Sequence, residues 1–233
     1  MRVTLSFEET SSNDLSVMVD ALRASTSITA ALNNFDEIIP CFSPENAFKI
    51  NKKKKGVLAG ERNGVKIKGF DLGNSPDSLE NYEFSDDEFK RLILTTTNGT
   101  RVLEDIKSTT IIGSLINAKS VAKHALNLSK EHIDVVMAGR NGYFAIEDFL
   151  ASGEILYWIS KEIKDKNDFK ISEYAQSAIL ARGDYDKIKE AFYNSYSGRR
   201  LSEIGCKNDV DYCTQKNITD NVAIYENGVL KLV

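Results

Sequence analysis

Short apolar runs alternate along most of the chain with longer stretches in which apolar residues recur every three or four positions. The short runs predict β-strands at residues 3–7, 16–20, 37–41, 57–59, 92–96, 110–113 and 134–138. Several runs are almost wholly apolar, as expected of strands that are covered on both faces. The longer stretches predict helices at residues 25–34, 44–53, 100–106, 117–130 and 145–164. This alternation favours an α/β fold of three layers, with right-handed crossovers and a largely parallel sheet.

The pattern changes near residue 171. Short helices are expected there at residues 172–180, 185–194 and 197–204, followed by two short strands within residues 221–233. The strands turn at Glu226-Asn227-Gly228, a typical hairpin signal, and we expect this hairpin at the edge of the main sheet. We therefore divide the chain into an α/β sheet domain at residues 1–170, which carries the candidate site, and a helical segment with a terminal hairpin at residues 171–233. No low-complexity linker separates the two parts, so one domain is the alternative.

Composition and charge exclude several classes of protein. The 233 residues include 30 Lys plus Arg and 34 Asp plus Glu, and the net charge of −4 argues against a nucleic-acid partner. No apolar run approaches the roughly 20 residues of a membrane helix, and the start of the chain lacks a signal core. Three scattered cysteines suit neither a disulfide framework nor a paired-cysteine zinc site. We expect a cytoplasmic protein with no membrane partner; a homodimer is expected from base rates alone.

Polar clusters follow several of the predicted strands, at the ends where open α/β sheets bind ligands. Two of these clusters, at residues 20–27 and 95–101, are rich in hydroxyl groups and lead into a helix. Backbone N–H groups and the helix dipole favour a phosphate at such a position. The candidate anion-binding residues are Arg23, Ser25, Thr26, Thr96, Thr97, Asn98, Gly99, Thr100 and Arg101. The alternative is that Ser25 and Thr100 are ordinary N-caps, but the occurrence of two such turns in one sheet favours an anion site.

Carboxylates accompany the hydroxyl-rich turns. The candidate metal ligands are Asp20, Glu61, Asp71, Glu147 and Asp148. Such hard oxygen ligands suit Mg²⁺, which polarises phosphoryl groups and can activate a bound water. As alternatives, Glu147 and Asp148 complement the N-terminus of a helix, and Asp71 between glycines serves a turn. Asp20, at the carboxyl end of a strand, is the strongest candidate for chemistry.

Other catalytic motifs are missing from the sequence. It contains no P-loop, no dinucleotide-binding glycine motif, no H-E-x-x-H and no G-x-S-x-G. Asp20 is not followed by a second Asp two positions on, so the paired aspartates of haloacid dehalogenases do not fit either. His124 and His132, eight residues apart, are interpreted as surface or half-buried side chains.

Several segments resemble, in order, the signatures of the 2-phosphosulfolactate phosphatase family. They comprise residues 19–27, 60–64, 69–76 (G-F-D-L-G-N-S-P), 95–101 (T-T-T-N-G-T-R), Gly113-Ser114 with Asn117-Ala118, Ala138-Gly139 with Glu147-Asp148, and the stretch from Ser197-Gly198-Arg199 to Asp211-Tyr212-Cys213. The resemblance runs from about residue 15 to the end. Ala21, where an aliphatic residue is expected, and Arg140-Asn141 are mild departures.

The resemblance implies a Mg²⁺-dependent phosphatase that converts 2-phospho-3-sulfolactate to 3-sulfolactate and phosphate, a step towards coenzyme M, and that accepts related phosphate esters of 2-hydroxy acids. On such a substrate, Asp20 and Arg23 would be catalytic, and Asp20 with Glu61 or Asp71 would anchor the ion. Whether water or Asp20 attacks phosphorus stays open.

The substrate also carries a carboxylate and a sulfonate. Arg62, Lys66 or Arg140 would bind these groups, because guanidinium forks match planar oxyanions. The rival interpretations are a non-catalytic protein that binds a phosphorylated metabolite and an isomerase of a phosphorylated acid.

Overall fold

The computed structural model describes residues 1–85, 89–97, 102–103, 106–164 and 168–233. The candidate residues Asn98, Gly99, Thr100 and Arg101, and most of the helix expected at residues 100–106, lie outside these ranges. The strands are β1 Arg2–Phe7, β2 Leu15–Val19, β3 Glu37–Pro40, β4 Val57–Arg62, β5 Val65–Lys66, β6 Arg91–Thr95, β7 Thr109–Ile112, β8 His132–Met137, β9 Lys170–Ile171, β10 Ala223–Glu226 and β11 Val229–Leu232. The helices are α1 Ala24–Ala31, α2 Pro44–Lys53, α3 Pro76–Glu80, α5 Ala118–Leu128, α6 Ile146–Glu162, α7 Glu173–Ala181, α8 Tyr185–Asn194, α9 Tyr196–Glu203 and α10 Lys207–Cys213, with a 3-10 turn η1 at Leu115–Asn117.

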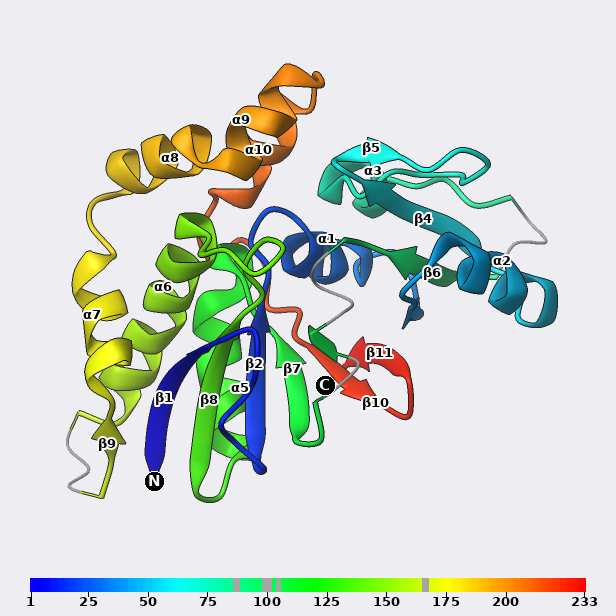
Figure 1. Ribbon diagram of the computed structural model, residues 1–233. Helices are drawn as coiled ribbons and strands as arrows, with labels where there is room; N and C mark the ends of the chain where they lie inside the picture. The colour runs from blue at the N-terminus through cyan, green and yellow to red at the C-terminus, as the bar shows by residue number, and fades with distance from the viewer. Residues whose placement is uncertain (86–88, 98–101, 104–105, 165–167) are drawn as a thin grey trace.

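The described strands form one mixed sheet in the order β5-β4-β6-β3-β11-β10-β7-β2-β8-β1-β9. Two blocks are parallel: β7-β2-β8-β1-β9 on one side and β4-β6-β3 on the other. The hairpin β10-β11 joins the blocks through antiparallel pairs with β7 and β3 (Figure 1). The fold class expected from the sequence, α/β with a largely parallel sheet, a helical C-terminal part and a terminal hairpin, is confirmed.

The position of the terminal hairpin was predicted wrongly. It lies in the middle of the sheet, not at its edge, because Ile224 pairs with Ile111 of β7 while Leu230 pairs with Ile38 of β3. Each parallel block would otherwise leave an unpaired strand edge at this point, and a hairpin offers one free edge to each. The turn itself is as expected, since Asn227 and Gly228 both have positive φ angles of 51° and 80°.

Helices cover both faces of the sheet. One hydrophobic cluster packs β1, β2 and β8 against α5 and α6, with Val17, Val135 and Ile155 fully buried. A second cluster lies on the opposite face, where α1 and α3 cover the strands through Ile28 and Leu79. A third, smaller cluster lies under α2. These layers bury both faces of the strands, which explains why their sequences are almost continuously apolar.

The start of α2 follows the N-cap and proline signals seen in the sequence. Ser43 caps α2 by accepting a hydrogen bond from the N–H group of Asn46 at 3.2 Å, and Pro44 occupies the first helical position. In the described ranges, no helix combines the length and apolar character needed to cross a bilayer. The expected division near residue 170 stays a prediction; strands from both sides of it share one sheet.

Candidate active site

A cavity of about 460 Å³ lies where loops from both parallel blocks meet the C-terminal helices. Its walls come from the loops after β2, β4, β6 and β8, from the segment before α3, and from α9. The lining residues are Asp20, Leu22, Arg23, Glu61, Asn63, Gly64, Asn74, Thr96, Thr97, Arg140, Asn141, Tyr196, Ser197, Arg200, Leu201 and Glu203. The carboxyl ends of β2, β4, β6 and β8 therefore converge on one cavity, as expected from the polar clusters that follow predicted strands.

Asp20 follows directly after β2 and lines the cavity with only 7% of its surface exposed. Its Oδ1 accepts a hydrogen bond from the N–H group of Ala24 at 3.2 Å, at the start of α1. The N–H group of Asp20 donates to Ser25 Oγ at 2.8 Å. Strand end and helix start thus hold the Asp20 backbone and carboxylate in place at the cavity wall.

Ser25 and Thr26, both predicted as anion ligands, are not among the residues that line this cavity. Both side chains are fully buried. Besides accepting from Asp20, Ser25 Oγ donates to the carbonyl oxygen of Met18 at 3.3 Å, and Thr26 Oγ1 donates to that of Ala21 at 3.0 Å. Their hydroxyl groups therefore shape the turn around Asp20.

Arg23 lines the cavity and is held from two sides. Its guanidinium donates to Asp209 Oδ2 of α10 and, at 3.0 Å, to the carbonyl oxygen of Gly64. Asp209 is itself 4% exposed and accepts a second hydrogen bond from Ser75 Oγ at 2.6 Å. Asp209 was missed at the sequence level, because a lone aspartate in a short C-terminal helix carries no local sign of an arginine partner 186 residues away.

Glu61 and the Thr97 turn form another wall of the cavity. Glu61 Oε1 accepts hydrogen bonds from the N–H group and from Oγ1 of Thr97, each at 2.9 Å, and its Oε2 accepts one from the N–H group of Gly64 at 2.7 Å. Thr96 lies beside them and is 4% exposed. The structure thus brings together Asp20, Glu61, Thr96 and Thr97 as predicted.

Three other predicted residues, Asp71, Arg62 and Lys66, lie outside the cavity lining. Asp71 is exposed, and its Oδ2 accepts from the N–H group of Leu58 at 2.8 Å, so it serves the turn that was the alternative interpretation. Arg62 donates to two carbonyl oxygens and to Thr95 Oγ1, at 2.7–3.1 Å. Lys66 donates to the carbonyl oxygen of Asp71 at 3.3 Å.

Glu147 and Asp148 begin α6 and are 3% and 2% exposed. Asp148 Oδ1 accepts from the N–H group of Ala21 at 2.7 Å, and its Oδ2 accepts from that of Gly139 at 3.0 Å. Burial, followed by the nearby charges of Asp20 and Glu147, raises the pKa of Asp148 well above its usual value. Asp148 therefore ties the turn after β2 to the turn after β8, and Glu147 lines a smaller adjoining hollow of about 130 Å³.

The donor set can be tested against a magnesium ion. Within the described ranges, no three His, Cys, Asp or Glu side chains gather as a metal cluster. The cavity lining holds three carboxylates, of which Glu203 is paired with Arg200; the other two are Asp20 and Glu61. The amide side chain of Asn74 also lines the cavity. Asn74 Oδ1 is buried and has no hydrogen-bond partner among the described residues. Two carboxylates and an unsatisfied amide oxygen fit Mg²⁺, which takes few protein ligands and keeps several waters.

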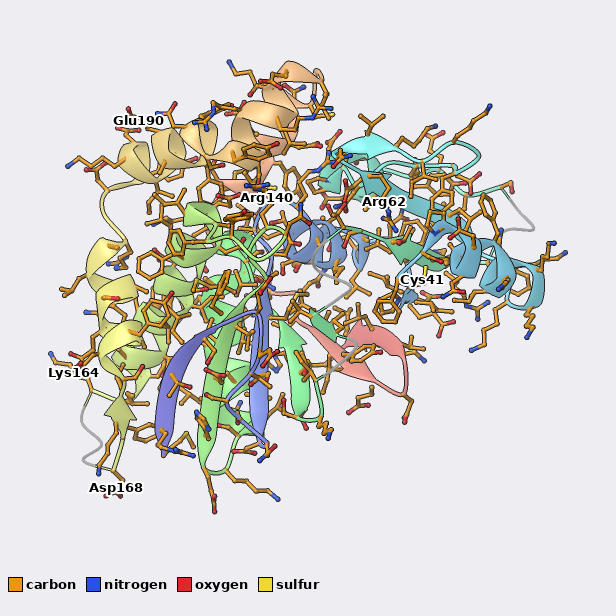
Figure 2. All side chains as sticks on the ribbon, in the orientation of Figure 1. Cys41, Arg62, Arg140, Lys164, Asp168 and Glu190 are labelled. Atoms are coloured by element: carbon orange, nitrogen blue, oxygen red, sulfur yellow. The ribbon has the colours of Figure 1, made fainter. Side chains whose placement is uncertain are left out.

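Sequence reasoning also missed Asn63, Asn74, Tyr196, Arg200 and Glu203 as cavity residues. Asn74 stands within the G-F-D-L-G-N-S-P segment, so the motif marked the region but not the side chain. Tyr196, Arg200 and Glu203 lie on α9, which matches the helix expected at residues 197–204, but the local pattern did not indicate that this helix lines the cavity. Arg140 and Arg62 are labelled in Figure 2, with Arg140 near α9 and Arg62 at the end of β4.

Comparisons with known proteins place these residues in a family. Residues 3–228 match the family described as 2-phosphosulpholactate phosphatase. The 2-phosphosulfolactate phosphatase of Methanothermobacter thermautotrophicus is 44% identical over 233 residues, which is 100% of this chain and 96% of that protein. The probable 2-phosphosulfolactate phosphatase of Clostridium novyi is 38% identical over 92% of this chain and 90% of its own length. That of Thermotoga maritima is 38% identical over 93% and 91%. The chain therefore belongs to the 2-phosphosulpholactate phosphatase family, whose name describes phosphoric monoester hydrolases.

Proposed function

We propose that this protein hydrolyses 2-phospho-3-sulfolactate to 3-sulfolactate and phosphate with the help of Mg²⁺, and that this reaction serves coenzyme M biosynthesis. The observation that carries the proposal is the convergence of Asp20, Arg23, Glu61 and Thr97 on one cavity. The names of the relatives support the substrate, and the unsatisfied amide oxygen of Asn74 supports the ion. Related 2-hydroxy-acid phosphates share the phosphate and carboxylate, so we expect slower hydrolysis of these esters as well.

Phosphoryl transfer depends above all on positioning and on neutralising charge. Arg23 uses its guanidinium to hold Asp209 and Gly64, and the same planar group, which carries five N–H donors, can also donate to phosphoryl oxygens in the cavity. Thr97 donates both its N–H and its hydroxyl group to Glu61, whereas Thr96 also lines the cavity. Arg23 and Thr96 would bind the phosphoryl group and orient the scissile P–O bond.

Asp20 is the proposed centre of the chemistry. As a carboxylate at the cavity wall, it can attack phosphorus or take the proton of an attacking water; both roles need the ionised form. Asp20, Glu61 and Asn74 would hold Mg²⁺ through oxygen atoms. When bound, the ion would withdraw charge from the phosphoryl oxygens and the leaving alkoxide.

The test is a phosphate-release assay over a panel of 2-hydroxy-acid phosphates, run with EDTA and with added Mg²⁺. We expect release from 2-phospho-3-sulfolactate that stops in EDTA and returns with excess Mg²⁺. Full activity in chelator would remove the ion from the mechanism. Conversion of the ester without free phosphate would favour an isomerase, and binding without conversion would favour a phosphometabolite-binding protein.

A further inference from the structure

Arg140 differs from the other arginines around the cavity in its partners. Arg23 is paired with Asp209, and Arg200 lies 3.5 Å from Glu203. In the part of the chain that the structure describes, no carboxylate lies within ion-pair distance of Arg140, although its side chain is partly buried and lines the cavity. A guanidinium that is partly removed from water and has no counter-charge is well suited to an anionic ligand.

The backbone around Arg140 is held firmly in place. Arg140 and Tyr143 exchange two backbone hydrogen bonds of 2.9 and 3.0 Å, which close a turn through Asn141 and Gly142 with positive φ angles. The preceding residue, Gly139, donates to the buried carboxylate of Asp148. The arginine is therefore presented from a fixed turn at the end of β8.

The guanidinium is also held by an aromatic ring. Its carbon Cζ lies 3.8 Å from the centre of the Tyr196 ring and 5.5 Å from that of Tyr143. Tyr196 is the first residue of α9, and Ser197 beside it also lines the cavity. Stacking on Tyr196 fixes the plane of the guanidinium but uses none of its N–H donors, and the positive end of the α9 dipole adds to the same field.

The other two cations considered for this role make hydrogen bonds to oxygen atoms of the protein. The guanidinium of Arg62 donates to three oxygen atoms of the protein, and Lys66 donates to a backbone carbonyl. Neither of them lines the cavity. Of Arg62, Lys66 and Arg140, Arg140 is therefore the one placed to bind a second anionic group of a ligand in the cavity.

We propose that Arg140, stacked on Tyr196, binds the sulfonate of the substrate and so selects phosphate esters that carry a second, strongly acidic group. This inference rests on the proposed function, because it assigns part of the same cavity to one group of that substrate. Arg23 and Thr96 would bind the phosphoryl end.

The test compares two esters that differ only in the sulfonate: 2-phospho-3-sulfolactate and 2-phospholactate. For Arg140→Gln we expect kcat/KM on the sulfonated ester to fall by about 10- to 100-fold, mainly through KM, which is the size of a lost charged hydrogen bond. On 2-phospholactate, the same variant should change kcat/KM by less than about threefold. Arg140→Lys, which keeps the charge but not the fork, should restore part of the preference.

Arg182 provides a matched control. Its guanidinium also stacks on a tyrosine, Tyr157 at 3.4 Å, but it is paired with Glu154 and does not line the cavity. Arg182→Gln should therefore leave the ratio of the two kcat/KM values unchanged. Thermal unfolding checks that each variant is folded. If Arg140→Gln does not fold, the same comparison of the two esters is made with Arg140→Lys.

The outcomes separate the inference from the proposed function. Equal losses on both esters in Arg140→Gln, with an active wild-type protein, would overturn the sulfonate site and leave the phosphatase intact. If Arg182→Gln also loses the preference for the sulfonated ester, the effect is not local to the cavity, and the sulfonate site is overturned as well. Wild-type protein that releases phosphate from neither ester would contradict the proposed function, and the inference would fail with it.

Discussion

Two buried aspartates, Asp134 and Asp148, lie toward opposite ends of the parallel block around β2 and β8, and they are bound in different ways. Asp134, on the amino-terminal half of β8, is fully buried and receives hydrogen bonds on both carboxylate oxygens. The donors are the hydroxyl groups of Thr4, Ser6, Thr10 and Ser11 and the N–H group of Ser11, at 2.5–3.0 Å. Asp148, at the carboxyl ends, is also buried but accepts from two N–H groups.

Their charged neighbours differ as well. Close to Asp134 lies His132, which shares a hydrogen-bond partner with it in Thr4. Asp148 instead faces two further carboxylates, and burial, followed by repulsion from Asp20 and Glu147, raises its pKa. Like charges gathered at one end of a sheet cost stability, and proteins keep them where they serve a site. The contrast favours the carboxyl end as the functional end.

The largest effect is expected for Asp20→Asn. The amide keeps the shape but loses the charge, so it can neither attack phosphorus nor accept a proton from water. We expect kcat to fall by about 10³-fold or more, with little change in thermal unfolding. Phosphate release under saturating substrate measures this, and wild-type turnover in the variant would remove Asp20 from the chemistry.

Asp148→Asn should have the next largest effect on activity. An amide can accept from only one of the two N–H groups and turns a donor toward the other, which displaces the turns that carry Asp20 and Arg140. We expect kcat to fall by about 10- to 100-fold, more than KM rises. Unchanged kcat would show that Asp148 does not position the site.

Asp134→Asn is the matched change at the other end. The free energy of unfolding should fall by about 1–3 kcal/mol, because the buried donors lose one of their two acceptor oxygens and face an NH₂ group in its place. Activity should stay within about twofold of wild type, since none of the donors to Asp134 lines the cavity. Urea unfolding and phosphate release on the same sample measure stability and activity. A large loss of kcat in folded protein would contradict the assignment of Asp134 to a purely structural role.

The smallest effect concerns pH and His132. Burial, followed by the charge of Arg2, lowers the pKa of His132 below 6.5, so the unfolded chain takes up the proton first as pH falls. Its contribution to stability is therefore present above pH 6.5 and is lost as pH falls through that value. Unfolding free energies of wild type and His132→Gln at pH 7.5 and 5.5 measure this. The wild type should lose more unfolding free energy than the variant between pH 7.5 and 5.5. An equal loss would contradict the role given to His132.

The sequence predicted the parts of this picture that depend on local pattern. The strand expected at residues 16–20 is β2 Leu15–Val19, and the rule for strand ends then put Asp20 and Thr97 in one cavity. Ser25 and Thr26 were predicted to bind an anion, but their hydroxyl groups bind nearby backbone oxygens. The sequence does not distinguish these two uses of a hydroxyl group.

Long-range placement was harder to predict. The central position of β10 and β11 depends on two free strand edges that exist only once both blocks have formed. The stacking of Arg140 on Tyr196 and the pairing of Arg23 with Asp209 join residues far apart in the chain, through packing that has no periodic signature.

A crystal structure of the Asp20→Asn variant with Mg²⁺ and 2-phospho-3-sulfolactate would show whether the cavity beside Asp20 binds the phosphate ester. We expect the intact ester in the cavity, with the phosphoryl group against Arg23 and Thr96 and the sulfonate against Arg140. An ester bound elsewhere on the molecule, with this cavity filled by water alone, would contradict this expectation.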